Sequence, residues 1–250
     1  MKVSRVQWLR SLLFVITIYS AMAVLGLVFF IPTLFSRDWA FRACKTFCRF
    51  TLWSARWMVG IETEVRGPVP TGEVMIASKH QSFLDIILIF LHVPRGKFIM
   101  KRELIWAPVI GQYALRLGCV PVDRGKRGVA IARMLADVAK NPDKAGQLII
   151  YPQGTRVAPG DYRPYKAGTG ALYEDIGQTC AMAATNVGLF WPRRGIWRKP
   201  GLAVVEFLEP VAPGMEKRAF MDHLENKIEA RSNALMREAG FEPEGGPADS

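Results

Sequence analysis

The chain has 250 residues, of which 50% are hydrophobic, and its formal net charge is +11. This length suits one substantial α/β core, with or without a membrane appendage. The basic excess favours nucleic acid, an anionic membrane surface or an acidic soluble carrier as partner. Because the aromatic residues accompany a long apolar segment and no nucleic-acid-binding module is recognisable, the sequence favours an anionic membrane and no nucleic acid.

The N-terminal region predicts a membrane anchor. Residues Ser11 to Phe35 carry no charged side chain, so this segment can cross the hydrocarbon core or lie deep in one leaflet. Basic residues precede it, and Ala21-Met22-Ala23 resembles a cleavage site, so a secretory signal is the alternative. The apolar run continues beyond that site to Phe30, which favours a retained anchor.

Residues Trp39 to Val59 predict a second, amphipathic helix in the headgroup region. Its basic residues recur at helical spacing and its aromatic residues suit an interface; they are Arg42, Lys45, Arg49 and Arg56, with Phe41, Phe47, Phe50, Trp53 and Trp57. The alternative is a helix of the soluble domain with an ordinary solvated face. We therefore expect residues 1–60 to anchor the protein to the inner (cytoplasmic) membrane, with the main domain on the cytoplasmic face.

Residues 61–240 alternate short apolar strands with helical segments, which predicts an α/β domain with a central mixed sheet flanked by helices. The expected strands are Ile61–Val65, Val74–Ser78, Lys97–Met100, Cys119–Val122, Leu148–Tyr151, Cys180–Thr185 and Leu202–Phe207. The expected helices are Asp85–His92, Ala107–Leu117, Gly128–Ala139, Gly168–Ile176 and Lys217–Ala239. Residues 241–250 are expected to form a disordered tail.

The cysteines Cys44, Cys48, Cys119 and Cys180 have no paired metal-ligand spacing. They therefore predict neither a zinc site nor a disulfide framework, and they favour a reducing, cytosolic setting for the main domain.

A histidine and a carboxylate lie where an apolar strand gives way to a helix, in Lys79-His80-Gln81-Ser82-Phe83-Leu84-Asp85. His80 and Asp85 can meet only if His80 lies in the loop and Asp85 in the first helical turn, which the capping-box pattern Ser82-x-x-Asp85 favours. A neutral imidazole held by a buried carboxylate is a general base. Alternatively, Asp85 only caps the helix and His80 is an ordinary loop residue.

Two further strand ends carry arginine. Arg124 follows one strand, and Gly154-Thr155-Arg156 follows another. Gly154 permits a tight turn, Thr155 offers a hydroxyl, and the arginine fork can bind a phosphate through two hydrogen bonds. Each arginine alone is more simply a surface residue. Because strand ends in an open α/β sheet converge on one cleft, the three together predict a base beside a phosphate clamp.

These motifs resemble those of the glycerophospholipid acyltransferases typified by 1-acylglycerol-3-phosphate acyltransferase. The similarity covers roughly residues 61–210. It includes His80-x4-Asp85, Gly118 to Arg124, Tyr151-Pro152-Gln153-Gly154-Thr155-Arg156, Lys101-Arg102-Glu103-Leu104 before Pro108 and Gly111, and Asn186-x-Gly188 before Trp191. Gln153 replaces the usual glutamate, and Cys180-Ala181-Met182-Ala183-Ala184 replaces a usual Val-Pro step.

The resemblance implies a membrane-bound O-acyltransferase that uses acyl-CoA or acyl carrier protein as donor and a lysolipid hydroxyl as acceptor. It implies 1-acylglycerol 3-phosphate as the acceptor and phosphatidic acid as the product, with neither metal nor cofactor. His80 and Asp85 would be catalytic. The substrate-binding candidates are Arg124, Arg156, Lys101, Gln153, Gly154 and Thr155.

Two alternatives remain open. The departures at Gln153 and in the fourth block favour a phosphorus-free acceptor, such as a lyso-aminolipid of the lyso-ornithine type. The other alternative is a non-catalytic, basic membrane-binding protein, which retention of the histidine, carboxylate and arginine motifs together disfavours.

Overall fold

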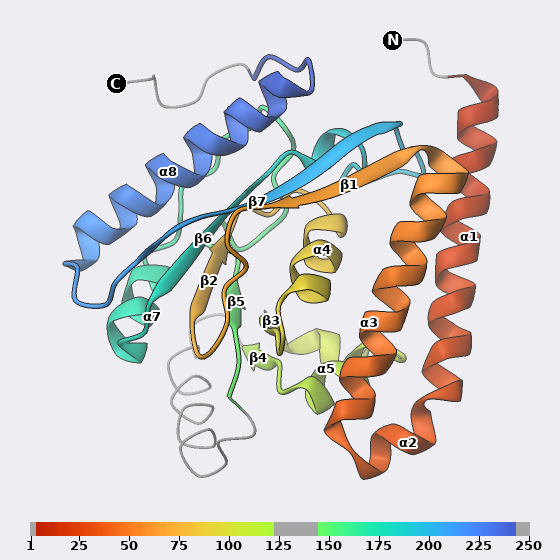
Figure 1. Cartoon of the computed structure of the whole chain (residues 1–250), viewed down its shortest axis with the longest axis horizontal. Helices are drawn as coiled ribbons and strands as arrows, with labels where there is room; N and C mark the ends of the chain where they lie inside the picture. The colour runs from red at the N-terminus through yellow and green to blue at the C-terminus, as the bar shows by residue number, and fades with distance from the viewer. Residues whose placement is uncertain (1–3, 123–144, 244–250) are drawn as a thin grey trace.

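The structure, a computed structural model, describes residues 4–122 and 145–243, and a central sheet dominates them (Figure 1). Its strands are β1 (Ile61–Arg66), β2 (Met75–Ser78), β3 (Lys97–Lys101), β4 (Val120–Val122), β5 (Leu148–Ile150), β6 (Cys180–Thr185) and β7 (Gly201–Val211). These seven described strands run in the order β1-β7-β6-β2-β5-β3-β4. Only the β6–β7 pair among them is antiparallel, so the sheet is mixed, as predicted.

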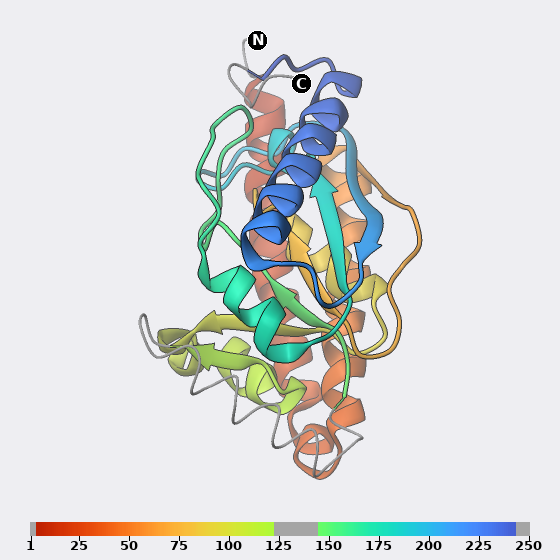
Figure 2. The ribbon, with the colours of Figure 1, turned by 90° about the vertical axis from the view of Figure 1, so that its left-hand side faces the viewer.

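Helices cover both faces of the sheet. They are α1 (Arg5–Val28), α2 (Phe30–Phe35), α3 (Arg37–Ser54), α4 (Leu84–His92), α5 (Ile110–Leu117), α7 (Gly168–Ile176) and α8 (Lys217–Glu238). Helices α1, α3, α4 and α5 contribute to the apolar core on one face, whereas α7 and α8 contribute to the core on the other. Figure 2 shows α8 lying across the face of the sheet that it shares with α7.

The two cores follow from the alternation of side chains along the strands. In β2, Ile76 points to the α4 side, whereas Met75 and Ala77 point to the α8 side. In β5, Ile149 and its neighbour Ile150 divide in the same way. Strands buried on both faces are continuous apolar runs, which is why the sequence identifies them clearly.

Two elements of the α/β domain have boundaries that differ from the sequence prediction by more than one residue. Helix α5 begins at Ile110 rather than Ala107, because a 3₁₀ helix occupies Arg102–Trp106 and Val109 takes a φ of 62°. Strand β7 runs to Val211, beyond the expected end at Phe207, because residues 201–206 pair with β1 and residues 205–211 pair with β6. The helix predicted at 128–139, and most of the predicted tail, lie outside the described residues.

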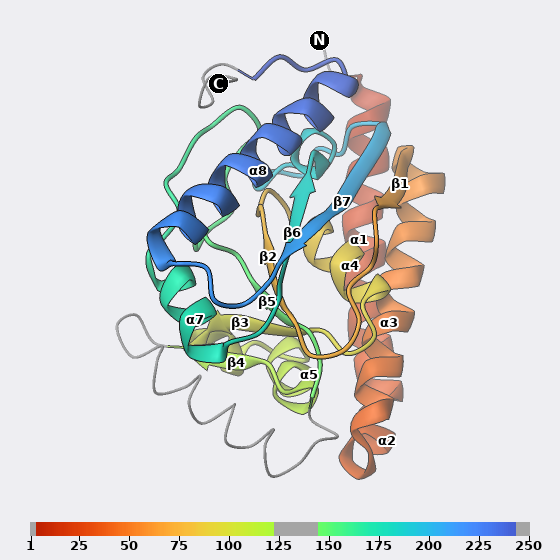
Figure 3. The same ribbon diagram turned by 60° about the vertical axis from the view of Figure 1, so that its left-hand side comes forward.

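Helix α1 packs along the α/β domain near both of its ends (Figure 3). Near its N-terminus, the Gln7 amide donates to the carbonyl of Arg198 at 2.8 Å, and the Arg198 amide donates to the Ser11 hydroxyl at 3.0 Å. Near its C-terminus, the Tyr113 hydroxyl donates to the Gly26 carbonyl at 2.9 Å. Within the described residues, α1 is the one helix long and apolar enough to cross a membrane, which by itself is a weak indication.

The outer side of α1 and α2 is apolar. Its exposed large residues are Val6, Trp8, Leu9, Leu13, Ile16, Tyr19, Val24, Leu27, Val28, Phe30, Ile31, Leu34 and Phe35. On α3 and the π-helical turn Ala55–Val59, Arg42, Arg49 and Arg56 are exposed together with Trp53 and Trp57.

Two residues assigned to the interfacial side of α3 lie elsewhere. The Lys45 ammonium donates to the Val93 carbonyl at 2.9 Å, and Phe41 is buried in the core. The interfacial role of the remaining side of α3 stays a prediction.

The buried thiols of Cys48, Cys119 and Cys180 generate a prediction. Burial raises the pKa of Cys48 and Cys180 to about 12 and that of Cys119 to about 11. At pH 8, below these values, the thiols stay protonated and are poor nucleophiles. We expect slow alkylation by iodoacetamide in the folded protein and fast alkylation in guanidinium, followed by mass spectrometry. Rapid modification of all three in the folded chain would contradict the buried arrangement.

Candidate active site

The start of α4 organises the loop that follows β2. Asp85 lies in the first turn, and its Oδ2 accepts hydrogen bonds from the amides of Gln81 at 2.8 Å and Ser82 at 2.7 Å. The Ser82 hydroxyl accepts from the Leu84 amide at 3.1 Å. The helix therefore begins at Leu84 with Phe83 as N-cap, rather than at Asp85 with Ser82 as N-cap. Of the two hydrogen bonds of a capping box, the one that forms is donated by the Ser82 amide to the Asp85 carboxylate.

His80 lies in the loop with its Nδ1 2.8 Å from Asp85 Oδ1. The Asp85 side chain is fully buried, whereas 13% of the His80 side chain is exposed. A carboxylate only accepts hydrogen bonds, so in the neutral imidazole Nδ1 carries the proton and Nε2 keeps its lone pair. The geometry is that of an oriented general base with one edge accessible.

The ring of Tyr151 stacks on His80, with centroids 3.9 Å apart and planes inclined by 19°. Phe98 stacks behind Tyr151 at 6.3 Å. Burial, followed by the negative charge of Asp85, raises the pKa of Tyr151 well above its ordinary value. The imidazole is thus held at Nδ1 by a carboxylate and on one face by a neutral aromatic ring.

The loop after β5 is attached to the backbone of the histidine. The Val157 amide donates to the His80 carbonyl at 2.8 Å, and the Gly154 amide donates to the Tyr151 carbonyl at 2.9 Å. Gly154 takes a φ of 68°, in the left-handed region that favours glycine, and an added Cβ would lie 2.5 Å from Lys166 Nζ. This turn brings the segment with Thr155 and Arg156 next to the histidine loop.

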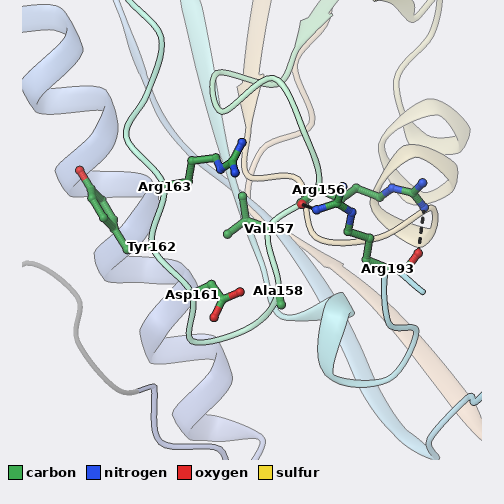
Figure 4. A pocket seen from close by; sticks show the side chains of 7 residues that line it. All are labelled: Arg156, Val157, Ala158, Asp161, Tyr162, Arg163 and Arg193. Carbon is green, nitrogen blue, oxygen red and sulfur yellow. Dashed lines mark hydrogen bonds between the residues drawn. The ribbon is translucent and has the colours of Figure 1, made fainter. Parts of the chain in front are cut away.

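A pocket of about 270 Å³ opens on this loop (Figure 4). It is lined by Arg156, Val157, Ala158, Asp161, Tyr162, Arg163 and Arg193. Arg193 Nη1 donates to the Arg156 carbonyl at 2.8 Å, and Arg156 Nη1 lies 3.5 Å from the Arg193 carbonyl. Three guanidinium groups against one carboxylate give the pocket a positive balance, which suits a phosphate.

The predicted site residues divide into several groups. Arg156 lines the pocket and Thr155 lies beside it in the same loop, half-buried. Gln153 is fully buried and donates to Glu229, so its side chain is not at the pocket. Lys101 is exposed at the end of β3 and does not line the pocket. Arg124 lies outside the described residues.

The sequence motifs do not include two arginines that line the pocket, Arg163 and Arg193. Arg193 follows β6, whose carboxyl end lies beside that of β2 because the two strands are parallel neighbours. The sequence Trp191-Pro192-Arg193-Arg194 therefore carried the same signal as the other arginine motifs, a cation shortly after a strand end. Arg163 lies in an irregular stretch with no such signal.

Comparison with known proteins places the chain in a family. A model of the Acyltransferase family matches residues 61–183. The 1-acyl-sn-glycerol-3-phosphate acyltransferase of Pseudomonas aeruginosa is 30% identical over 240 residues, which cover 94% of this chain and 93% of that protein. The mouse 1-acyl-sn-glycerol-3-phosphate acyltransferase alpha is 31% identical over 171 residues, which cover 66% of this chain and 60% of the mouse protein.

The fold has a solved counterpart. The crystal structure of the 1-acyl-sn-glycerophosphate (LPA) acyltransferase PlsC from Thermotoga maritima aligns with a TM-score of 0.73 at 19% identity, covering 91% of this chain and 97% of that one. The chain belongs to the acyltransferase family, and it is an enzyme of that class.

The Tyr151 ring, rather than its hydroxyl, should support the histidine. A raised pKa keeps the hydroxyl protonated and uncharged throughout the neutral range, so Tyr151→Phe should leave the pH profile of acyl transfer unchanged. Tyr151→Leu removes the stacking plane, worth ~0.5–1.5 kcal/mol, and should lower kcat by about 2- to 12-fold. The measurement is kcat against pH for both variants. A shifted alkaline limb in the Phe variant would show that the hydroxyl titrates with the reaction.

Proposed function

We propose that this enzyme transfers a fatty acyl group from acyl-CoA or acyl carrier protein to the free hydroxyl of 1-acylglycerol 3-phosphate, giving phosphatidic acid. The observation that carries the proposal is the His80–Asp85 pair at 2.8 Å, on a loop hydrogen-bonded to the arginine-lined pocket. The names of the bacterial and mouse relatives state the same acceptor.

In this mechanism, His80 Nε2 accepts the proton of the acceptor hydroxyl as its oxygen attacks the thioester carbonyl. The new C–O bond forms, the C–S bond breaks, and the proton passes from the imidazolium to the leaving sulfur. Asp85 keeps the proton on Nδ1 and stabilises the imidazolium, as the carboxylate of a catalytic triad does. The Gln81 and Ser82 amides hold the carboxylate in place, so it needs no reorganisation during the reaction.

The acceptor phosphate would bind at the arginine pocket. Arg156 and Arg193 fix each other through their backbone carbonyls, which presets the spacing of two guanidinium groups before substrate arrives. Arg163 adds a third cation to the same lining. The substrate-binding roles of Lys101 and Arg124 stay predictions from the sequence.

A lyso-aminolipid acceptor is less well supported by the geometry. The small residues of the fourth block form strand β6 and are buried within the sheet, so they do not line the pocket. Gln153 contacts Glu229 rather than the pocket. Both sequence departures that favoured this acceptor therefore lie away from the arginine lining.

The membrane would hold α1 and α2 along one leaflet. Hydrogen bonds attach α1 to the α/β domain at Gln7 and at Gly26. If α1 crossed the ~30 Å of hydrocarbon, the parts of the domain bonded to it would have to enter the hydrocarbon as well. A helix lying in the interface exposes its apolar side to lipid and leaves the domain in water. The exposed arginines of α3 would then lie near lipid phosphates at the cytoplasmic surface of the inner membrane.

Replacing the proposed base tests the reaction class. His80→Ala should lower kcat by ~10²–10⁴-fold, the usual contribution of general-base catalysis. His223→Ala, on the polar helix α8, is the matched control and should retain activity. The assay incubates the detergent-purified protein with acyl-CoA or acyl carrier protein and lysophosphatidate, with products read by mass spectrometry. Full activity of the His80 variant would refute the proposed mechanism.

The pocket arginines test the acceptor. Arg156→Ala and Arg193→Ala each remove a charge-assisted contact worth about 1.5–3 kcal/mol, so KM for lysophosphatidate should rise roughly tenfold or more. The same variants should not change turnover of a lyso-aminolipid, which has no phosphate to lose. Steady-state kinetics with matched acyl chains measure both values. A preference of the unaltered enzyme for the lyso-aminolipid would reverse the assignment.

A further inference from the structure

Glu229 of α8 is a buried carboxylate close to the histidine loop and the arginine loop. It forms an ion pair with Lys79, and both side chains are almost fully buried, at 4% and 1% exposure. Its Oε1 accepts from the Tyr165 hydroxyl at 3.0 Å and from Gln153 Nε2 at 3.4 Å. One carboxylate thus contacts three separate segments of the chain.

The partners of Glu229 lie next to the site residues. Lys79 immediately precedes His80, and Gln153 lies between Tyr151, which stacks on the histidine, and the turn that leads to Arg156. Glu229 therefore joins the strand end that carries the base to the loop that carries the anion-binding arginine.

Helix α8 fixes the neighbouring strand end as well. The Thr185 amide, at the end of β6, donates to the Ser232 hydroxyl at 3.2 Å, and the Asn186 side chain donates to the Leu235 carbonyl at 3.1 Å. Figure 3 shows α8 extending along the sheet above β6 and β2.

The charge balance of this network explains Gln153. A buried ammonium is stable only with a compensating carboxylate, and Lys79 has one in Glu229. A glutamate at position 153 would place a second negative charge beside Glu229, whereas the amide donates to it instead. The Gln153 Oε1 finds no hydrogen-bond partner among the described residues, so the amide contributes here only as a donor.

We propose that Glu229 is a positioning residue of the acyl-transfer site, and that it supplies from α8 the carboxylate that holds Lys79, next to His80, and Gln153, in the arginine loop. The inference rests on the proposed function for its kinetic consequence, although the charge balance is independent of substrate. Glu229 and Gln153 form an exchangeable pair: the buried network that includes Lys79 needs one carboxylate and one amide, and either position can hold either group.

The experiment is a double-mutant cycle with Glu229→Gln, Gln153→Glu and the double variant in the detergent-purified full chain. Glu229→Gln leaves the buried Lys79 without a carboxylate, and Gln153→Glu gives the network two. Either change should shift the loops of His80 and Arg156. Misplacement of this kind costs up to ~10²-fold, so we expect kcat/KM for lysophosphatidate to fall by about that factor, with kcat lowered and KM raised. The double variant should recover to within roughly tenfold of the unaltered enzyme, a non-additivity typical of contacting residues.

Glu238→Gln is the matched control, since Glu238 is also on α8 and paired with two arginines but lies outside the site. Its kcat and KM should not change. Kinetics are measured well below each thermal midpoint, so that a purely structural carboxylate would alter the midpoint and leave kcat and KM unchanged. The proposal would be overturned if both single variants kept the kcat and KM of the unaltered enzyme. It would also be overturned if the kcat/KM of the double variant were no higher than that of the less active single variant.

Thermal midpoints measured without substrate separate this inference from the proposed function. If the unaltered enzyme does not acylate lysophosphatidate, the proposed function fails, but the thermal midpoints of the three variants still test the exchange. Lower midpoints in both single variants and a restored midpoint in the double variant support the exchange. Losses that simply add in the double variant refute it. If a single variant does not fold, folding of the double variant supports the exchange, and its failure to fold refutes it.

Discussion

The Asp85 carboxylate is the constraint on which the site depends. It is fully buried and accepts from two backbone amides and from His80 Nδ1. The amide bonds fix the start of α4, and the same rigid carboxylate then fixes the tautomer and direction of the imidazole. Helix capping and orientation of the imidazole are therefore one arrangement, and the proposed role of Asp85 as catalytic partner is compatible with its role at the helix start.

The sheet topology extends this local arrangement to a site. β2, β5 and β6 are parallel neighbours, so the loops after them gather at one edge, as ligand sites in open α/β sheets do. Backbone hydrogen bonds connect the histidine loop to the arginine loop. Glu229 adds a buried ion pair with Lys79 from α8, which covers the face of the sheet opposite to α4. Placement of the proposed base and of the arginine-lined pocket is consequently shared between the sheet edge and α8.

Local patterns predicted most of the fold, and long-range contacts account for what was missed. All seven predicted strands form, since buried apolar runs are strong signals, and His80 and Asp85 meet because the motif itself contains the turn that joins them. Nothing local distinguishes Glu229 from the other acidic residues of α8, and nothing local shows that Gln153 points inward. Their positions depend on a contact between residues 76 apart in sequence.

The most direct test of the central claim is the tautomer of His80, measured by ¹⁵N NMR of the histidine-labelled full chain in detergent. The chain has three histidines, so a His80→Gln variant assigns the resonance. The account predicts that the neutral imidazole carries its proton on Nδ1 and leaves Nε2 unprotonated, and that this preference is lost in Asp85→Ala. A proton on Nε2 in the unaltered enzyme would leave no lone pair to accept the substrate proton and would contradict the account.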